Sequence, residues 1–222
     1  MEKKKKLVIF GKDMIAKLAH FYFTRDSEYE VVAFTVDQKY IDGDSYLDLP
    51  LVPFEKMETL YPAIEFSLFV AIGTSKMNDN REAKFLEVKN KGYKLASYIS
   101  PRAVYDSKVG ENCIVGDMTV IQPFATIGDN NFIWEQCFIA CDSVVGNNCS
   151  FSSKSVVSTY AIIGNNSILG SGAIIKTRVL IAEKSLIGAA SYIAINTKES
   201  GVYGEKNSKF AGAISHKIDI SM

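Results

Sequence analysis

The sequence predicts a small Rossmann-like α/β domain followed by a parallel β-helix of about five coils built from hexapeptide repeats. Three observations predict this. Strands alternate with helices up to about residue 97, apolar residues recur at every sixth position from Val109, and glycine–asparagine corners recur at every eighteenth. We therefore expect an α/β domain at 1–97, a β-helix at 98–196 and a C-terminal tail at 197–222.

In the first domain, apolar runs of strand length alternate with segments of helical spacing. We expect buried strands at 6–11, 29–37 and 66–73, a short strand at 95–99, and helices at 14–23 and 78–91. Such alternation produces a parallel sheet, which binds ligands at the carboxyl ends of its strands. Gly11 stands alone where a dinucleotide fingerprint needs three spaced glycines, so that kind of site is not indicated.

The second half of the chain has a strict period of six. From Val109 to Ile193, fifteen consecutive apolar residues follow one another at this spacing, and the residue two positions before each is small or short except at Val179. Neither an α-helix nor a meandering sheet gives this period. A hexapeptide repeat does, because each branched residue points inward from one face of a triangular β-helix. Three hexads make one coil, so fifteen predict five coils.

A second period marks the corners of the coils. Gly110, Gly128, Gly146 and Gly164 are each followed two residues later by asparagine, at intervals of 18 residues. Glycine and asparagine both tolerate the left-handed backbone that a tight corner requires.

Composition excludes several classes of protein. The 25 basic residues balance the 25 acidic ones, which argues against a nucleic-acid-binding protein. The longest apolar runs, such as 68–72, are far shorter than a membrane span, and the run after the N-terminal lysines is too short for a signal peptide. We expect a soluble cytoplasmic protein.

The four cysteines favour reduced structural thiols rather than a metal or redox site. Cys113, Cys137, Cys141 and Cys149 are 24, 4 and 8 residues apart, with no Cys-x-x-Cys pair, and the β-helix contains no histidine. Three of them fall on the small inward position of a hexad, whereas Cys141 falls at a corner. No metal is expected.

The order of the two parts, together with several short motifs, resembles the NeuD/PglD-like bacterial sugar O- and N-acyltransferases. The motifs are Ala71-Ile-Gly73 with Arg81 downstream, Gly92-Tyr93, Ile99-Ser-Pro101 and Ile121-Gln-Pro-Phe124. The resemblance implies a homotrimer of left-handed β-helices, a nucleotide sugar in the N-terminal domain, and acetyl-CoA in the groove between neighbouring β-helices.

The same resemblance implies two sets of binding residues. The nucleotide sugar would contact the loops that follow three strands: Gly11, Lys12, Asp13, Asp37, Gly73 and Thr74. Acetyl-CoA would lie along small residues of the later coils, where the backbone is accessible, with a lysine for its phosphates: Gly170, Gly172, Lys176, Gly188 and Ala189.

The implied reaction is transfer of an acetyl group from acetyl-CoA to the amine of a UDP- or dTDP-linked amino-deoxy sugar, for lipopolysaccharide or another surface glycan. The family's histidine base corresponds to Cys141 here. Three hypotheses about catalysis follow from this difference. Asp142 or Glu135 takes the proton of an already nucleophilic amine, Cys141 serves as base or transient acyl carrier, or the chain is a degenerate homologue that binds nucleotide sugars or acts as a trimeric scaffold.

Overall fold

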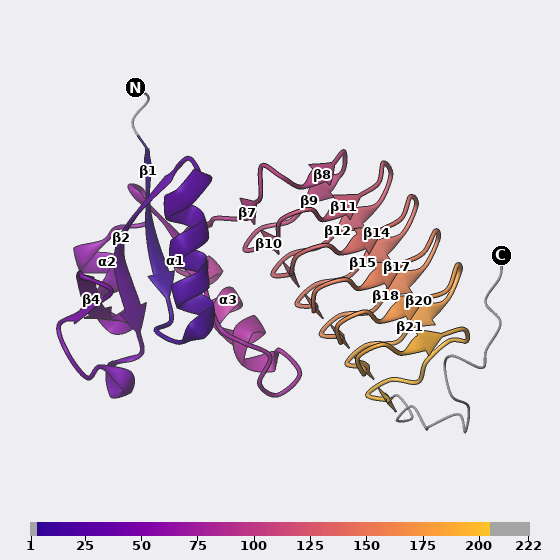
Figure 1. Ribbon diagram of the computed structural model, residues 1–222. Coiled ribbons are helices and arrows are strands. Elements are labelled where there is room, and N and C mark those ends of the chain that lie inside the picture. The colour runs from indigo at the N-terminus through magenta and orange to yellow at the C-terminus, as the bar shows by residue number, and fades with distance from the viewer. Residues whose placement is uncertain (1–3, 205–222) are drawn as a thin grey trace, which may run out of the picture.

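The computed structural model describes residues 4–204 and consists of an α/β domain joined to a long prism of stacked coils, as Figure 1 shows. The expected fold class, an α/β domain followed by a β-helix, is confirmed. His216 and the rest of the expected tail from residue 205 onward lie outside the described residues. No helix within residues 4–204 is both long enough and apolar enough to span a membrane.

The N-terminal domain contains one six-stranded sheet in the order β3-β4-β2-β1-β5-β6, parallel except for the β3–β4 pair. Its elements are β1 (Lys5–Phe10), α1 (Met14–Asp26), β2 (Tyr29–Val36), β3 (Ser45–Tyr46), β4 (Leu49–Pro53), α2 (Met57–Leu60), β5 (Phe66–Val70), α3 (Asp79–Asn90) and β6 (Lys94–Leu95). Short 3₁₀ helices occupy Gln38–Tyr40 and Phe54–Lys56.

Two details of this sheet differ from the expectation. The strand expected at 95–99 is two strands, because β6 ends the N-terminal sheet while the next strand begins the β-helix. Neither β3 nor β4 is among the expected strands. β3 has only two residues, and Pro50 and Pro53 obscure the pattern of β4, because proline donates no ladder hydrogen bond.

The β-helix has three flat faces, each a ladder of two-residue strands. The first face contains β7 (Tyr98–Ile99), β10 (Ile114–Val115), β13 (Phe132–Ile133), β16 (Ser150–Phe151), β19 (Ile168–Leu169), β22 (Leu186–Ile187) and β24 (Val202–Tyr203). The second contains β8 (Val104–Tyr105), β11 (Val120–Ile121), β14 (Phe138–Ile139), β17 (Val156–Val157), β20 (Ile174–Ile175) and β23 (Tyr192–Ile193). The third contains β9 (Lys108–Val109), β12 (Thr126–Ile127), β15 (Val144–Val145), β18 (Ile162–Ile163) and β21 (Leu180–Ile181).

The inward residues of these strands are the predicted hexad residues. From Val115 to Ile193 every one of them is buried, and they form one continuous core. Cys113, Cys137 and Cys149 are fully buried beside them, as predicted from their small hexad position. The hexad count did not include β7, β8 and β24, which extend the ladders at both ends.

The chain turns between faces at three kinds of corner: the first corner follows a first-face strand, the second follows a second-face strand, and the third follows a third-face strand. At the third corner the left-handed residue is asparagine in four successive coils: Asn112, Asn130, Asn148 and Asn166. The glycines two residues earlier serve a different purpose from the one predicted. A Cβ on Gly164 would lie 2.7 Å from the backbone nitrogen of Glu183 in the next coil. These glycines therefore permit close stacking of the coils.

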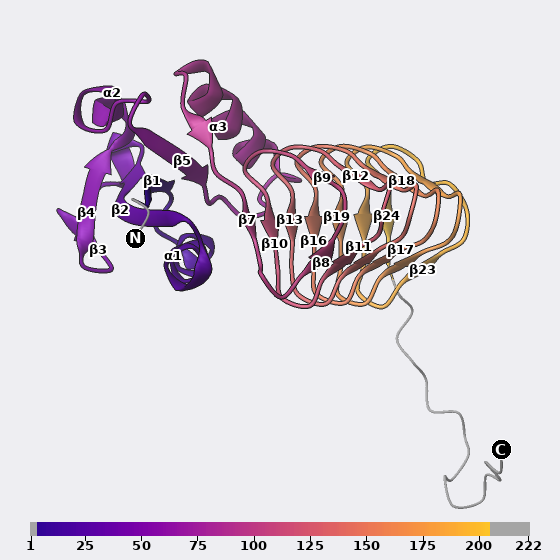
Figure 2. The ribbon, with the colours of Figure 1, turned by 90° about the horizontal axis from the view of Figure 1, so that it is seen from above.

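The four corner asparagines also join the two domains. The Asn112 amide donates to Asn130 (2.7 Å), Asn130 donates to Asn148 (2.8 Å), and Asn148 donates to Asn166 (3.3 Å). At one end, the Asn112 side chain pairs with the backbone of Val70 in β5, and at the other end Asn166 donates to carboxylates of α3. We call this row the asparagine ladder. Figure 2 shows α3 beside the coils that it reaches.

Replacement of Ile163 by alanine in the centre of the β-helix is expected to lower the free energy of unfolding by about 2–5 kcal/mol, because Ile163 is 1% exposed and the cavity would lie inside close-packed coils. Ile195→Ala, at a site that is 74% exposed, is the matched control and should change stability by less than about 0.5 kcal/mol. Urea unfolding measures both, and equal losses would contradict the assigned core.

Candidate functional site

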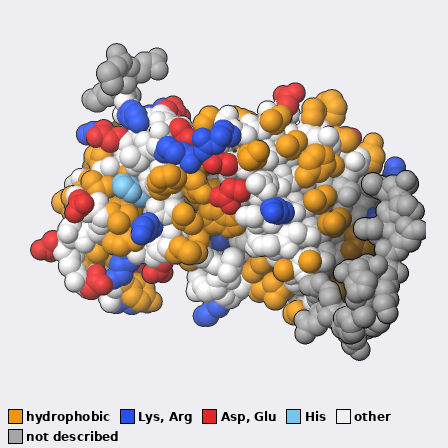
Figure 3. All heavy atoms as spheres, in the orientation of Figure 1, with side chains coloured by type: hydrophobic (Ala, Val, Ile, Leu, Met, Phe, Trp, Pro, Cys, Tyr) orange, Lys and Arg blue, Asp and Glu red, His pale blue; other side chains and the backbone are white. Residues whose placement is uncertain are grey.

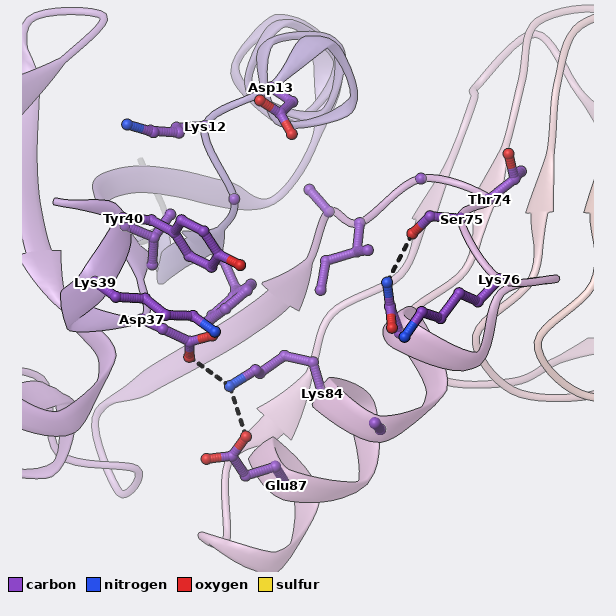
Figure 4. Close-up of a pocket in the computed structure, with 18 residues that line it drawn as sticks. Lys12, Asp13, Asp37, Lys39, Tyr40, Thr74, Ser75, Lys76, Lys84 and Glu87 are labelled. Atoms are coloured by element: carbon purple, nitrogen blue, oxygen red, sulfur yellow. Dashed lines mark hydrogen bonds and ion pairs between the residues drawn. The ribbon is translucent and has the colours of Figure 1, made fainter. Parts of the chain in front are cut away.

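A cavity of about 900 Å³ lies at the carboxyl ends of β1, β2 and β5 (Figure 4). All six residues predicted to bind the nucleotide sugar line it: Gly11, Lys12, Asp13, Asp37, Gly73 and Thr74. They come from three separate loops, which the parallel sheet brings to one edge. The cavity therefore lies where the strand pattern placed a ligand site.

Gly11 permits two strand ends to approach each other below this cavity. Its φ is +129°, and a Cβ there would lie 2.7 Å from the carbonyl oxygen of Ala71, just after β5. Any other residue would push β1 away from β5 and is disfavoured at this φ. The requirement for glycine is thus geometric, whatever the cavity binds.

The N-terminus of α1 begins at the cavity wall. Asp13 precedes the first helical residue, but its side chain makes no capping hydrogen bond to the helix. The N–H groups of the first turn therefore lack a side-chain cap, and together with the helix dipole they favour an anion. Lys39 and Lys76 add two exposed ammonium groups to the wall. This part of the cavity suits a phosphate or diphosphate.

Asp37, at the end of β2, is held by a lysine that the sequence analysis did not identify. The Lys84 ammonium lies 2.7 Å from Asp37 and 2.6 Å from Glu87, and it rests over the ring of Phe54 at 4.4 Å. Burial opposes its charge, but the hydrogen bonds to the two carboxylates outweigh this effect and raise the pKa of Lys84. Figure 4 shows Lys84 reaching from α3 across to Asp37.

The predicted site residues do not include the part of the cavity wall formed by α3 and the turn before it, which consists of Ser75, Lys76, Asn80, Ala83, Lys84 and Glu87. Their pattern is that of a charged helix, which is typical of a solvated surface. Only the packing of α3 against the sheet brings these side chains to the cavity.

The three catalytic candidates do not come together within one chain. Cys141 and Asp142 lie on the second corner, Asp142 being exposed with a φ of +57°, while Glu135 lies on the first corner. None of the three lines the cavity. Any joint action with the cavity therefore has to involve a second copy of the chain or a movement of the domains.

Glu135 already has two hydrogen-bond donors. The Tyr22 hydroxyl of α1 donates to it at 2.5 Å, and the Ser153 hydroxyl donates to its other oxygen at 3.1 Å. Burial and the neighbouring carboxylate raise the pKa of Tyr22, so this donor stays protonated. In this arrangement Glu135 bridges α1 and the first corner of the β-helix.

Four of the five predicted acetyl-CoA residues share one edge. Gly170, Gly172, Gly188 and Ala189 lie on the first corners of two successive coils, and a Cβ on Gly170 would lie 2.5 Å from the backbone nitrogen of Ala189. Gly172 has a φ of +68° and open space around it. Lys176 is exposed on the second corner, away from the other four. Residues 4–204 hold no cluster of three or more histidine, cysteine or acidic side chains suited to a metal ion.

We expect one of the four thiols to react rapidly with a disulfide reagent in the native protein. Burial raises the pKa of Cys137 to about 11 and those of Cys113 and Cys149 to about 12, so few thiolates form there, whereas Cys141 is partly exposed. Cys141→Ser should abolish the rapid phase. A rapid phase that survives this substitution would show that a core thiol is accessible.

Lys84→Met should destabilise the protein in a pH-dependent way. Because the folded-state pKa of Lys84 is raised, its ionic stabilisation is complete below its ordinary value of 10.5 and is lost as the pH rises through the raised value. The difference in unfolding free energy between wild type and variant should therefore shrink above about pH 10.5. Urea unfolding from pH 8 to 11 measures it, with exposed Lys56→Met as control. A constant difference would contradict the ionic role of Lys84.

Comparison with known proteins places the repeats in a described class. Residues 106–141 match the family model of the bacterial transferase hexapeptide, which spans six repeats. A search of curated protein sequences gave no significant match to the chain.

Solved structures share both parts of the fold. The acetyltransferase domain of PglB from Neisseria gonorrhoeae superimposes with a TM-score of 0.80 at 18% identity, over 93% of this chain and 99% of that domain. PerB from Caulobacter crescentus, in complex with CoA and GDP-perosamine, has a TM-score of 0.80 at 24% identity, over 93% and 97% of the two chains. WeeI from Acinetobacter baumannii has a TM-score of 0.75 at 16% identity, over 90% and 96%. Residues 106–141 are therefore similar to bacterial transferase hexapeptide repeats, and the chain has the two-part fold of these solved structures.

Proposed function

We propose that the protein is an acyltransferase that moves an acetyl group from acetyl-CoA to the amine of a nucleotide-linked amino-deoxy sugar used for a surface glycan. The observation that carries the proposal is the cavity at the carboxyl ends of the parallel sheet, which opens beside an uncapped helix N-terminus and is attached to a hexapeptide β-helix. PerB has the same fold and was solved with CoA and GDP-perosamine, which supports this pairing of substrates.

The nucleotide part of the substrate would occupy this cavity. Its diphosphate would accept hydrogen bonds from the first turn of α1 and from Lys76, and the Asp37 carboxylate would accept hydrogen bonds from ribose hydroxyls. Lys84 would keep Asp37 in place for this purpose. UDP and dTDP are the carriers that we favour, and GDP is included because of the PerB complex.

Acetyl-CoA would lie along the glycine-rich first corners of the later coils, in a groove completed by a second subunit. We propose a homotrimer because the outward residues of the second face, which lies between the first and second corners, form an apolar row. These residues stack in register from coil to coil and are Val104, Val120, Phe138, Val156, Ile174 and Tyr192. Figure 3 shows further hydrophobic side chains over the coils. Apolar rows of this kind are buried when copies of a chain associate around a symmetry axis.

In the proposed reaction, the sugar amine attacks the thioester carbonyl, the tetrahedral oxyanion collapses, CoA thiolate leaves and the amine loses a proton. Holding both substrates side by side supplies much of the rate, and a backbone N–H at a corner steadies the oxyanion. We favour Asp142 over Glu135 as proton acceptor, because Asp142 is exposed while both oxygens of Glu135 accept hydrogen bonds. Since Asp142 does not line the cavity of its own chain, the complete site would combine one subunit's cavity with a neighbour's second corner.

One observation favours a second candidate, a nucleotide-sugar-binding or scaffold protein without catalysis. The β-helix contains no histidine to act as a general base. In this alternative both ligands would still bind, because neither the cavity residues nor the glycine-rich first corners include the proton acceptor.

Thiol release from acetyl-CoA tests the proposal, measured with the purified protein against UDP-, dTDP- and GDP-linked 3- and 4-amino-deoxy sugars. Turnover with one of them supports the transferase. Binding of both ligands without turnover selects the non-catalytic alternative, and absence of CoA binding overturns the proposal.

The proton acceptor can be identified with four substitutions at three positions. Asp142→Asn should lower kcat by about 10²-fold or more with little change in KM, since a general base contributes about 10²–10⁴-fold. Glu135→Gln keeps the shape of the bridge to Tyr22 and should lower kcat by less than about tenfold. Cys141→Ser should leave turnover within a few-fold, and Cys141→His is expected to raise it. A large loss in Cys141→Ser together with none in Asp142→Asn would transfer the role to the thiol.

A further inference from the structure

A buried cation lies at the junction of the two domains. Arg81 in α3 is fully buried, and its guanidinium donates to the carbonyl of Cys149 at 3.0 Å and to the hydroxyl of Ser150 at 3.1 Å. It also lies over the ring of Phe132, 4.1 Å from the ring centroid. Apart from the Ile72 carbonyl of its own domain, at 3.4 Å, all of its hydrogen-bond acceptors belong to the β-helix, as does the aromatic ring. Arg81 thus fixes the start of α3 to the coils.

The turn immediately before α3 has an unusual backbone. Lys76, Met77 and Asn78 have φ values of +51°, +52° and +67°, three successive left-handed residues that all carry a Cβ. This conformation is disfavoured for each of them, so surrounding contacts have to maintain it. The turn forms one wall of the cavity through Thr74, Ser75 and Lys76.

The turn has a hydrogen bond of its own, from the Asn80 amide to the Ser75 hydroxyl, and it also has a contact from the β-helix. Ser150 donates its hydroxyl hydrogen to the Asn78 side-chain oxygen at 3.0 Å and accepts from Arg81. Asn78 is fully buried. Ser150 is the polar exception among the outward residues of the first face that the domain covers, which are otherwise Tyr98, Ile114 and Phe132. The Ser150 hydroxyl therefore bonds both to the last residue of the turn and to Arg81 in the first turn of α3.

The junction also contains buried polar groups that lack partners. Within residues 4–204, the Asn78 amide nitrogen and the Arg81 Nε have no hydrogen-bond acceptor. Unpaired buried donors are destabilising, and they persist mainly where a site requires a particular geometry. A simple apolar contact would have joined the domains without this cost.

We propose that Ser150 and Asn78 are positioning residues of the nucleotide site: they hold the 74–78 turn in its left-handed form, and so keep Lys76 and the turn backbone in place for the diphosphate. This inference rests on the proposed nucleotide-binding function of the cavity. It assigns to the β-helix a role in binding the nucleotide that is separate from binding CoA. Neither residue lines the cavity.

The test compares four variants of the full-length protein: Ser150→Ala, Asn78→Ala, Asn78→Gly and the control Ser155→Ala. Ser155 is buried in the same coil but bonds only to backbone carbonyls within the β-helix. Calorimetry measures affinity for UDP, dTDP, GDP and CoA. Hydrogen exchange measures the opening of the 73–80 segment without any ligand.

We expect Ser150→Ala to weaken binding of the nucleoside diphosphate by about tenfold or more, since misplacement of a binding group by about 1 Å can cost as much as about 10²-fold. Exchange in 73–80 should accelerate by about tenfold or more, because local opening becomes easier. CoA affinity should remain within about twofold, as in Ser155→Ala. Asn78→Gly should retain more affinity than Asn78→Ala, because glycine adopts the left-handed form freely and alanine does not.

Exchange in 73–80 that stays at the wild-type rate in Ser150→Ala would overturn the inference, as would equal losses of nucleotide and CoA affinity. Equal affinities in Asn78→Gly and Asn78→Ala would also contradict it, because the left-handed backbone would then be irrelevant. Failure of the wild-type protein to bind any of the three nucleotides would instead refute the proposed function, and the exchange experiment would still decide whether Ser150 maintains the turn.

Discussion

Stacking of coils at an interval of 18 residues is the constraint on which the rest of the structure depends. Each two-residue strand bonds to the strands one coil before and after it, so a residue type repeated at this interval forms a continuous row. The rows of branched residues fill the interior. Rows at the corners and on the outside are then available for other purposes, and the chain uses them to attach its first domain and to expose glycine-rich edges.

The attachment of the α/β domain combines apolar and polar contacts. The first face continues the apolar core on the α1 side of the sheet through Ile114 and Phe132. Around this core, the asparagine ladder, the buried Arg81 and the bridge between Tyr22 and Glu135 fix direction and register. Apolar contact alone is non-directional, whereas these hydrogen bonds have defined partners. The two domains are consequently held in one arrangement, with the cavity wall anchored to the coils.

Much of the fold could be predicted because its signals are local and periodic. The hexads located the core residues, and glycines and acidic residues after strands located one side of the cavity. Contacts that depend on tertiary packing gave no such signal in the sequence. Lys84 looks like a residue of a charged surface helix, yet it forms an ion pair with Asp37. Asn78 looks like the exposed start of that helix, yet it is fully buried. The corner candidates Cys141 and Asp142 could be placed on the coil from sequence, but their distance from the cavity depends on how two separate domains meet.

The asparagine ladder also sets a length. Its four asparagines reach from Val70, at the carboxyl end of β5, to the carboxylates of Asp79 and Glu82. Four coils therefore span the distance between β5 and the start of α3 on the domain side. If a whole coil were removed or added inside this interval, the last asparagine of the ladder would no longer lie beside the carboxylates of α3, although the hexad register would be preserved. The contacts to α3 end one coil further on, where the Lys184 ammonium lies 3.0 Å from the Asp79 carboxylate. Coils added past Lys184, at the far end of the β-helix, would leave all of these contacts to α3 unchanged.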